Sequence, residues 1–286
     1  RPSSLQANAN HDISGGTQAV KYFISGGAFT QNGSIRDFST NADGVNSNYF
    51  YRRYNMRSNL DIQATKSLSL RLDATARVGD VNQPYGQNVI NSIFNFAEVH
   101  PYSAPFLNPD GCYDYYRDTR NQRPTINAIL QTSGYSRQRR TDLNVLFGFT
   151  EKLHAITRGL SLIGRIAYAG VNQNTLNLFR DDDFPPSYYY DPVTGAYSLN
   201  TGVSSGGYTL AKYRTTGNTD LRNQRVNAQI YFNYERTFDK HHLTSLLLYN
   251  QQSYRVDYEA GIFGAIVAQV PQKFRGYSLK VGYDYE

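Results

Sequence analysis

Residues 54–78 alternate between apolar and polar side chains along two arms of eleven residues each. Successive side chains of a β-strand leave opposite faces of the pleat, so a period of two predicts β-strands. We therefore expect a hairpin whose strands are joined by the three residues 65–67. In the matching register leucines lie opposite leucines, and Asp61 lies opposite Arg71. One register therefore satisfies both the apolar and the charged face of the hairpin.

The length of these arms is the unusual property. Strands of soluble domains cluster near five or six residues, whereas a transmembrane β-strand needs about 9–11 residues at a tilt near 45°. Outer-membrane barrels contain runs of about ten residues that alternate between lipid-facing apolar and lumen-facing polar side chains. The alternative is a long-stranded soluble sandwich, whose apolar face packs on a second sheet. The hairpin by itself is compatible with both folds.

The order of the connections distinguishes the two folds. We expect strands near residues 6–14, 19–30, 50–64, 67–79, 136–150, 159–178, 222–238, 241–258 and 274–286. Short connections alternate with long ones, which lie near residues 31–49, 80–135, 179–221 and 259–273. This order puts the tight turns at one end of the sheet, as in barrels with short periplasmic turns and long extracellular loops. The prediction is an all-β fold of antiparallel up-and-down strands, part of a large transmembrane β-barrel.

The long connections carry two local expectations. A short helix is predicted near residues 87–98, and the residues DPVTG at 191–195 predict a turn within a small hairpin. Loops longer than about 15 residues are usually functional or disordered, and the many tyrosines favour order here.

Composition narrows the class of protein. The chain has 286 residues, a mean hydropathy of −0.57 and no apolar run of 18 residues. A helical membrane span is therefore excluded, whereas a barrel is not, because half of each strand and most of each loop are polar. The single cysteine, Cys112, permits no internal disulfide. The net charge of +6 is scattered and indicates a solvated surface rather than a dedicated anion site.

The two ends of the sequence carry an expectation about its extent. The sequence begins without Met, and residues 277–286 stop within a strand pattern. An unpaired strand edge is prone to aggregation. We therefore expect residues 1–286 to be a fragment of a single transmembrane barrel domain, with the remaining strands and any plug domain outside it.

Four segments resemble one family. ISGGTQAVKYFISGGAFTQNGSI and RRYNMRSNLDIQATKSLSLRLDATARV resemble the start of the barrel in SusC/RagA-like TonB-dependent transporters of Bacteroidetes-type bacteria. FDKHHLTSLLLYNQQSYR and FRGYSLKVGYDYE are similar to later strands of the same family, in the same order. The resemblance implies a plugged outer-membrane barrel, closed by a SusD-like surface lipoprotein and driven by TonB. The plug and the TonB-contacting segment are not within 1–286, so energised transport is expected of the larger protein.

Two sets of side chains are candidates for contact with solute. The polar set of the hairpin is expected to line a watery lumen, where it would guide solute or hold the plug, with wall scaffolding through cross-strand pairs as the alternative: Asn55, Arg57, Asn59, Asp61, Arg71, Asp73 and Arg77. Tyrosine offers a flat apolar face with a polar tip, which suits stacking on sugars or peptides. The tyrosine candidates, for which packing within the loops or against the lid is the alternative, are Tyr113, Tyr115, Tyr116, Tyr188, Tyr189 and Tyr190.

Two charged runs and an aromatic set suit roles away from the solute path. Clustered carboxylates can bind Ca²⁺, but the run Asp181, Asp182 and Asp183 lacks the spacing of an EF-hand loop, and a solvated acidic loop is favoured. The cationic run lacks a recognition helix for nucleic acid, and contact with anionic lipid head groups at the strand mouth accounts for it as well; it comprises Arg137, Arg139 and Arg140. An aromatic girdle at the membrane interface would suit Phe149, Tyr168 and Phe238, with ordinary packing as the alternative.

Signatures of catalysis are missing from the sequence. It contains no H-E-x-x-H, no G-x-S-x-G, no Walker loop and no cysteine pair. We expect neither an enzyme nor a cofactor, and no nucleic-acid partner. The sequence therefore predicts part of a TonB-dependent importer for oligosaccharides or peptides in the bacterial outer membrane, in contact with its lipid. A soluble β-rich carbohydrate-binding or structural protein and a passive porin are the two alternatives.

Overall fold

The computed structural model describes residues 4–35, 45–85, 105, 107–111, 115–117, 122–124, 130, 134–179, 188–199, 214–259, 266–268 and 270–285. Its strands are β1 (Gln6–Gly16), β2 (Val20–Asn32), β3 (Phe50–Gln63), β4 (Leu68–Pro84), β5 (Tyr115–Arg117), β6 (Gln122–Pro124), β7 (Gly134–Lys152), β8 (Leu160–Phe179), β9 (Tyr188–Tyr190), β10 (Tyr197–Leu199), β11 (Arg214–Phe238), β12 (His241–Glu259), β13 (Ile266–Ala268) and β14 (Gln272–Tyr285). Within the described ranges, no helix has the length and apolar character needed to cross a membrane.

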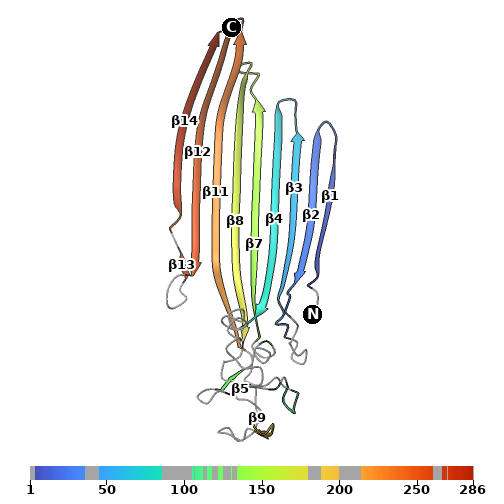
Figure 1. The fold of residues 1–286 in the computed structure, drawn as a ribbon. Helices are drawn as coiled ribbons and strands as arrows, with labels where there is room; N and C mark the ends of the chain where they lie inside the picture. The colour runs from blue at the N-terminus through green and yellow to red at the C-terminus, as the bar shows by residue number, and fades with distance from the viewer. Residues whose placement is uncertain are drawn as a thin grey trace.

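The long strands form one antiparallel sheet in which sequence neighbours are also neighbours in space (Figure 1). The order is β1-β2-β3-β4-β7-β8-β11-β12, and both β13 and β14 pair with β12. The tight connections β1–β2, β3–β4, β7–β8 and β11–β12 lie at one end of the sheet, here called the turn end. The long connections lie at the opposite end, the loop end. The predicted up-and-down topology is confirmed.

The β3–β4 hairpin has the predicted register, with Asp61 opposite Arg71. Its connection is held by Thr65, whose Oγ1 accepts hydrogen bonds from the backbone N–H groups of Ser67 and Leu68 at 3.2 and 2.9 Å. A side-chain oxygen that binds backbone N–H groups two and three residues ahead stabilises a tight turn. The local sequence therefore specifies both the turn and the register of this hairpin.

Two strands extend further toward the loop end than the sequence predicts. β4 continues to Pro84, and β11 begins at Arg214, so parts of the segments expected as loops are strand. The extension of β4 is polar, yet it pairs residue by residue with β7, for example Asp80 with Arg139. Cross-strand pairing stabilises these residues as strand despite their weak strand propensity.

The loop connections contain small hairpins of their own. The predicted turn at 191–195 joins β9 to β10, and its Asp191 accepts hydrogen bonds from the Val193 backbone N–H (2.9 Å) and the Thr194 hydroxyl (2.7 Å). β5 and β6 form a second such hairpin. The helix expected near 87–98 lies outside the described residues.

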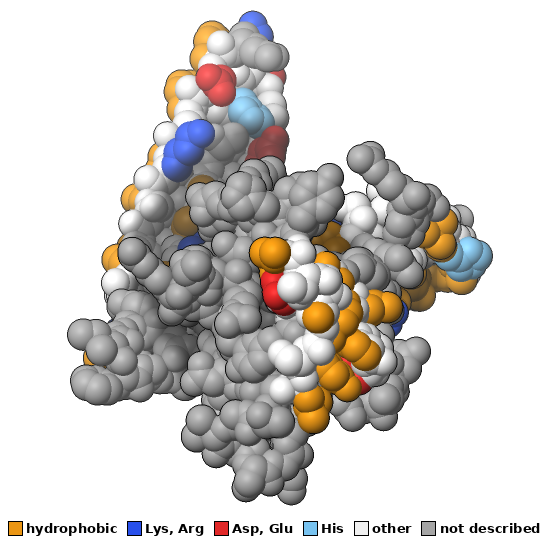
Figure 2. Space-filling model, turned by 60° about the horizontal axis from the view of Figure 1, so that its bottom comes forward, with side chains coloured by type: hydrophobic (Ala, Val, Ile, Leu, Met, Phe, Trp, Pro, Cys, Tyr) orange, Lys and Arg blue, Asp and Glu red, His pale blue; other side chains and the backbone are white. Residues whose placement is uncertain are grey.

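One face of the long sheet is apolar and uncovered. This apolar face carries Leu72, Phe147 and Ile166, which share a ladder row and are 39, 42 and 50% exposed. In Figure 2 hydrophobic side chains follow the outer margin of the tall wall of the sheet. Among the described residues, Leu130 is the one buried aliphatic or aromatic side chain. A soluble sandwich would bury such a face against a second sheet, whereas the other sheets among the described residues are only two-stranded hairpins.

The boundary of the apolar face at the loop end is staggered from strand to strand. In β3 the apolar set of this face reaches Tyr54 before Arg52 interrupts it, and the ladder row of Tyr54 runs through Val78 to Arg222 in β11 and Asp257 in β12. In β12 the last apolar residue is instead Tyr249, eight positions nearer the turn end (257 − 249 = 8). Strands that tilt against the axis of a barrel need such a stagger for the apolar belt to remain level in the membrane.

Aromatic rings on the apolar face cover glycines. A Cβ on Gly164 would overlap the ring of Phe149, and a Cβ on Gly170 would overlap the ring of Tyr168. Phe149 is the last apolar-face residue of β7 before Glu151, and Phe238 ends β11. The aromatic residues expected at membrane interfaces therefore lie on the apolar face, near the ends of their apolar runs.

Candidate functional site on the polar face

Polar side chains of β3 and β4 form a connected chain on the opposite face, here called the polar face. Arg57 Nε donates a hydrogen bond to Asn59 Oδ1 (2.9 Å), and Asn59 Nδ2 donates to Asp73 Oδ1 (2.6 Å). Arg71 Nε donates to the other carboxylate oxygen, Asp73 Oδ2, at 2.7 Å. The Asp73 carboxylate thus holds an amide from β3 and a guanidinium from β4 in fixed positions.

Arg71 lies opposite one carboxylate and forms a close ion pair with another. Asp61 lies directly opposite Arg71, but the ion pair of Arg71 is with Asp73, two residues further along the same strand. Residues two apart on a strand share a face and lie about 7 Å apart, a span that an arginine side chain bridges. Asp61 attracts Arg71 through space. The predicted register and the predicted opposition of Asp61 and Arg71 are therefore confirmed, and the structure adds a close ion pair of Arg71 with Asp73.

A second carboxylate organises the polar face nearer the loop end. Asp142 Oδ2 accepts a hydrogen bond from Arg77 Nε at 2.6 Å, and Asp142 Oδ1 accepts one from Arg140 Nε at 3.0 Å. Arg77 and Arg140 also line a hollow of about 150 Å³ together with Tyr51. Asn55 lies in the same ladder row as Arg77 and Asp142, and its side chain covers Gly27 of β2.

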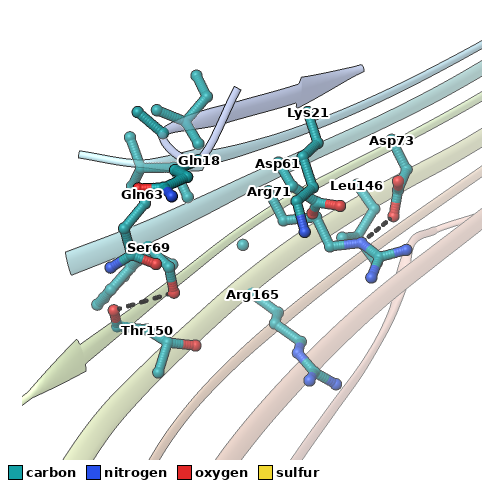
Figure 3. Close-up of a pocket in the computed structure, with 15 residues that line it drawn as sticks. Gln18, Lys21, Asp61, Gln63, Ser69, Arg71, Asp73, Leu146, Thr150 and Arg165 are labelled. Carbon is teal, nitrogen blue, oxygen red and sulfur yellow. Dashed lines mark hydrogen bonds and ion pairs between the residues drawn. The ribbon is translucent and has the colours of Figure 1, made fainter. Parts of the chain in front are cut away.

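A cavity of about 570 Å³ opens on the polar face near the turn end (Figure 3). Four of its five charged lining residues come from one ladder row, in which Lys21, Asp61, Arg71 and Arg165 project from β2, β3, β4 and β8, and the fifth is Asp73. The β7 residue of the same row is Gly148, whose missing side chain leaves a gap in the row. This volume lies within the range of small-molecule and peptide-side-chain pockets, roughly 300–1,000 Å³.

The cavity presents both signs of charge beside an apolar floor. Lys21 points toward Asp61 and Arg71, while Arg165 stands across the cavity from them (Figure 3). The Arg165 guanidinium lies 5.8 Å from the centroid of the Tyr231 ring, a cation–π distance. Leu146, the one apolar interruption of the polar set in β7, contributes the floor. Such a lining can bind a zwitterionic or mixed-charge chain segment.

The tyrosine-rich loop segments come together at the loop end. β5, which holds Tyr115 and Tyr116, contacts β9. Within the β9–β10 hairpin, Tyr197 lies between Tyr188 and Tyr190, with ring centroids 6.4 and 5.2 Å apart. Edge-to-face and tilted rings at these distances attract one another, so the aromatic faces here are held in place.

The structure covers most of the site residues proposed from the sequence. The seven predicted lumen residues lie in β3 and β4 on the polar face, at alternate positions of each strand. The side chains of Tyr188 and Tyr190 in β9 are described. For Tyr115, Tyr116 and Tyr189 the structure describes only the backbone. Tyr113, together with Asp181, Asp182 and Asp183, lies outside the described residues. Within the described part of the chain, no group of three or more His, Cys, Asp or Glu residues lies close enough to hold a metal ion.

Sequence reasoning missed four residues of these clusters. Lys21, Arg165 and Asp142 belong to the polar sets of β2, β8 and β7, and their partners lie on strands distant in the sequence. Alternation places each of them on the polar face, but only the pairing of the strands brings them together. Tyr197 is the second residue after the predicted turn, and the pairing of β9 with β10 places it across from Tyr190.

Comparison with known proteins identifies the fold. No family model and no curated protein matches the chain. The "Structure of the RagAB peptide transporter" is similar over 97% of this chain, with 14% identity and a TM-score of 0.52. A second structure, "Structure of the RagAB peptide importer in the 'open-open' state", is similar over 97%, with 15% identity and a TM-score of 0.54. The chain has the barrel fold of these transporters.

Barrels of this fold lie in the bacterial outer membrane, and such barrels turn an apolar face toward lipid and a polar face toward the lumen. The chain covers 30 and 29% of the length of the two matched chains. The ten-stranded sheet therefore corresponds to less than a third of each matched chain.

Proposed function

We propose that this chain forms part of the wall of a TonB-dependent outer-membrane importer for peptides or oligosaccharides. The observation that carries the proposal is the staggered apolar belt on a single, up-and-down sheet whose polar face is charged and hollowed. A barrel wall needs a continuous lipid-facing belt, and a solute path needs a wet, charged lining on the other side. The likeness to two RagAB structures, whose titles name a peptide transporter and a peptide importer, supports the same function.

Peptides are the favoured substrate class. The cavity near the turn end offers both cations and carboxylates, which match the charged termini and side chains of a short peptide better than an uncharged glycan. The tyrosine cluster at the loop end, by contrast, suits either a peptide side chain or a sugar ring. The charged side chains of the polar face are therefore the feature that favours peptides over glycans.

Two protein partners follow from the proposal. A SusD-like surface lipoprotein would close the barrel from the loop end, where the tyrosine-bearing hairpins β5–β6 and β9–β10 lie. TonB would engage the larger protein through a segment outside residues 1–286. Both partners are part of the proposal for the complete protein, and neither rests on a contact made by the described residues.

Uptake by cells provides the test. Cells that carry or lack the complete gene would be given fluorescent peptide mixtures and labelled oligosaccharides, with and without functional TonB. We expect gene-dependent accumulation of peptides that disappears when TonB is removed. Accumulation that persists without TonB would indicate a passive porin, and accumulation of oligosaccharides alone would reverse the substrate assignment.

A further inference from the structure

The arginine residues of the apolar face lie almost entirely on one side of its belt. At the loop end, beyond Tyr54 in β3, Leu143 in β7, Val226 in β11 and Tyr249 in β12, this face carries an arginine band that consists of Arg52, Arg137, Arg139, Arg222, Arg255 and Arg275. Apolar residues also lie within and beyond this band, namely Phe50, Tyr135, Leu176 and Leu178. The carboxylates on the same side of the belt whose side chains the structure describes are Asp80 and Asp257. At the turn end the same face carries Arg236 and Glu151, whose opposite charges sum to zero. The excess of positive charge is confined to the loop end.

The three arginines of the cationic run in β7 do not all lie on the same face of the sheet. Arg137 and Arg139 lie on the apolar face opposite Asn82 and Asp80, whereas Arg140 lies on the polar face and pairs with Asp142. Two of the three arginines therefore point toward the membrane side of the wall and cannot serve solute in the lumen.

The first three members of the band are held in position by neighbouring side chains. Arg139 Nε and Nη2 donate to the two oxygens of Asp80, at 2.7 and 3.0 Å. Arg137 Nε donates to Asn82 Oδ1 at 3.1 Å. The Phe50 ring lies beneath two guanidinium groups, with its centroid 4.5 Å from Arg52 Cζ and 5.7 Å from Arg137 Cζ. Side chains fixed in this way lose little conformational entropy when they bind an anion.

The positions of these groups define the chemistry of the ligand. Arg52 lies across from Asp80, and Arg139 lies on the next strand, so their backbones are about 10 Å apart, a distance that two arginine side chains can close around one phosphate. Directly below them toward the turn end, Tyr54 and Leu143 begin the apolar belt and are 54 and 40% exposed. A ligand of both surfaces must join an anionic head to hydrocarbon chains.

We propose that Arg52, Arg137 and Arg139 form a binding site for the phosphate groups of an outer-leaflet glycolipid, whose acyl chains lie on the apolar belt. The inference rests on the proposed outer-membrane location, because long loops face the outside in such barrels. Three arginines against one aspartate leave a net charge of +2 (3 − 1 = 2) for the lipid phosphates. Phosphate is the anion that the planar guanidinium fork matches best.

Native mass spectrometry of the complete, detergent-purified protein tests the site. The probes are diphosphoryl lipid A, its dephosphorylated form and phosphatidylglycerol, each added at fixed concentration. We expect the wild type to retain diphosphoryl lipid A, with affinity falling about fivefold for each arginine removed, in Arg52→Gln and in the triple variant Arg52→Gln/Arg137→Gln/Arg139→Gln. Arg140→Gln, next to Arg139 but on the polar face, is the matched control and should retain the lipid fully.

Three outcomes would overturn the proposal. One is equal retention of lipid A by the triple variant and the wild type. The second is equal binding of the dephosphorylated lipid, since the apolar belt alone would then hold it. The third is equal binding of phosphatidylglycerol, which would make the site one for any anionic lipid. Folding of each variant is checked by its heat-modifiable migration in gels, and Arg52→Gln removes no side-chain hydrogen bond between residues that the structure describes. Peptide uptake is measured in a separate experiment, so a negative uptake result would not change the interpretation of lipid binding.

Discussion

At the scale of single residues, glycines on the apolar face make room for aromatic rings of neighbouring strands. Gly164 of β8 lies opposite Phe149 of β7, and the ring occupies the space that a Cβ would need. Rings placed over glycines in this way shield the backbone of a sheet and fix its register. The same arrangement recurs where Tyr22 covers Gly15.

We expect Gly164→Ala to destabilise the folded barrel by about 1–3 kcal/mol, because the Phe149 ring must leave its place. The free energy of unfolding of the complete protein in urea would be measured in lipid vesicles. Gly26→Ala is the matched control, since its Cβ would have no neighbour within 4 Å on the same apolar face. The double variant Phe149→Leu/Gly164→Ala should recover part of the loss. Equal effects of the two alanine substitutions would contradict the steric account.

At the scale of the strand, alternation decides which side chains meet lipid. In the β3–β4 hairpin the apolar face holds residues 60, 62, 70 and 72, and the polar face holds residues 59, 61, 71 and 73. Spin labels at these eight positions of the complete protein in bilayers would report accessibility to oxygen and to a polar nickel reagent. We expect the first set to favour oxygen and the second to favour nickel. An apolar set shielded from both reagents would mean that this face packs on protein.

At the scale of the whole molecule, the stagger of the apolar belt requires strands that tilt in the membrane. Ile62 in β3 and Tyr249 in β12 lie in one ladder row, yet Tyr249 is at the loop-end boundary of its strand, as Tyr54 is in β3. Five strand pairs at a tilt of 35–45° shift the height along such a row by about 15 Å.

Depth-dependent quenching of fluorescent labels measures this shift. With quencher lipids confined to the leaflet at the loop end, we expect labels at 54 and 249 to be quenched alike and a label at 62 to be quenched less. Equal depths at 62 and 249 would indicate strands that stand upright, which is incompatible with closure of a barrel.

Much of the fold was specified by the sequence alone, because the alternation of side chains is a local property of an extended backbone. The hairpin register followed from matching two faces at once, and the topology followed from the order of short and long connections. The same alternation assigned Arg57, Asn59 and Asp73 to one face before any partner was known. The extensions of β4 and β11 were missed, since their polar residues are strand only because a neighbouring strand pairs with them.

The tertiary structure decided what depends on several strands together. It chose Asp73 over Asp61 as the partner of Arg71, and it joined Lys21 and Arg165 across a gap left by Gly148. It also set the stagger that places a level belt of apolar residues beneath the arginine band. These properties arise from the register between strands separated by long loops, and that register is determined by the pairing and tilt of the whole sheet rather than by any one segment.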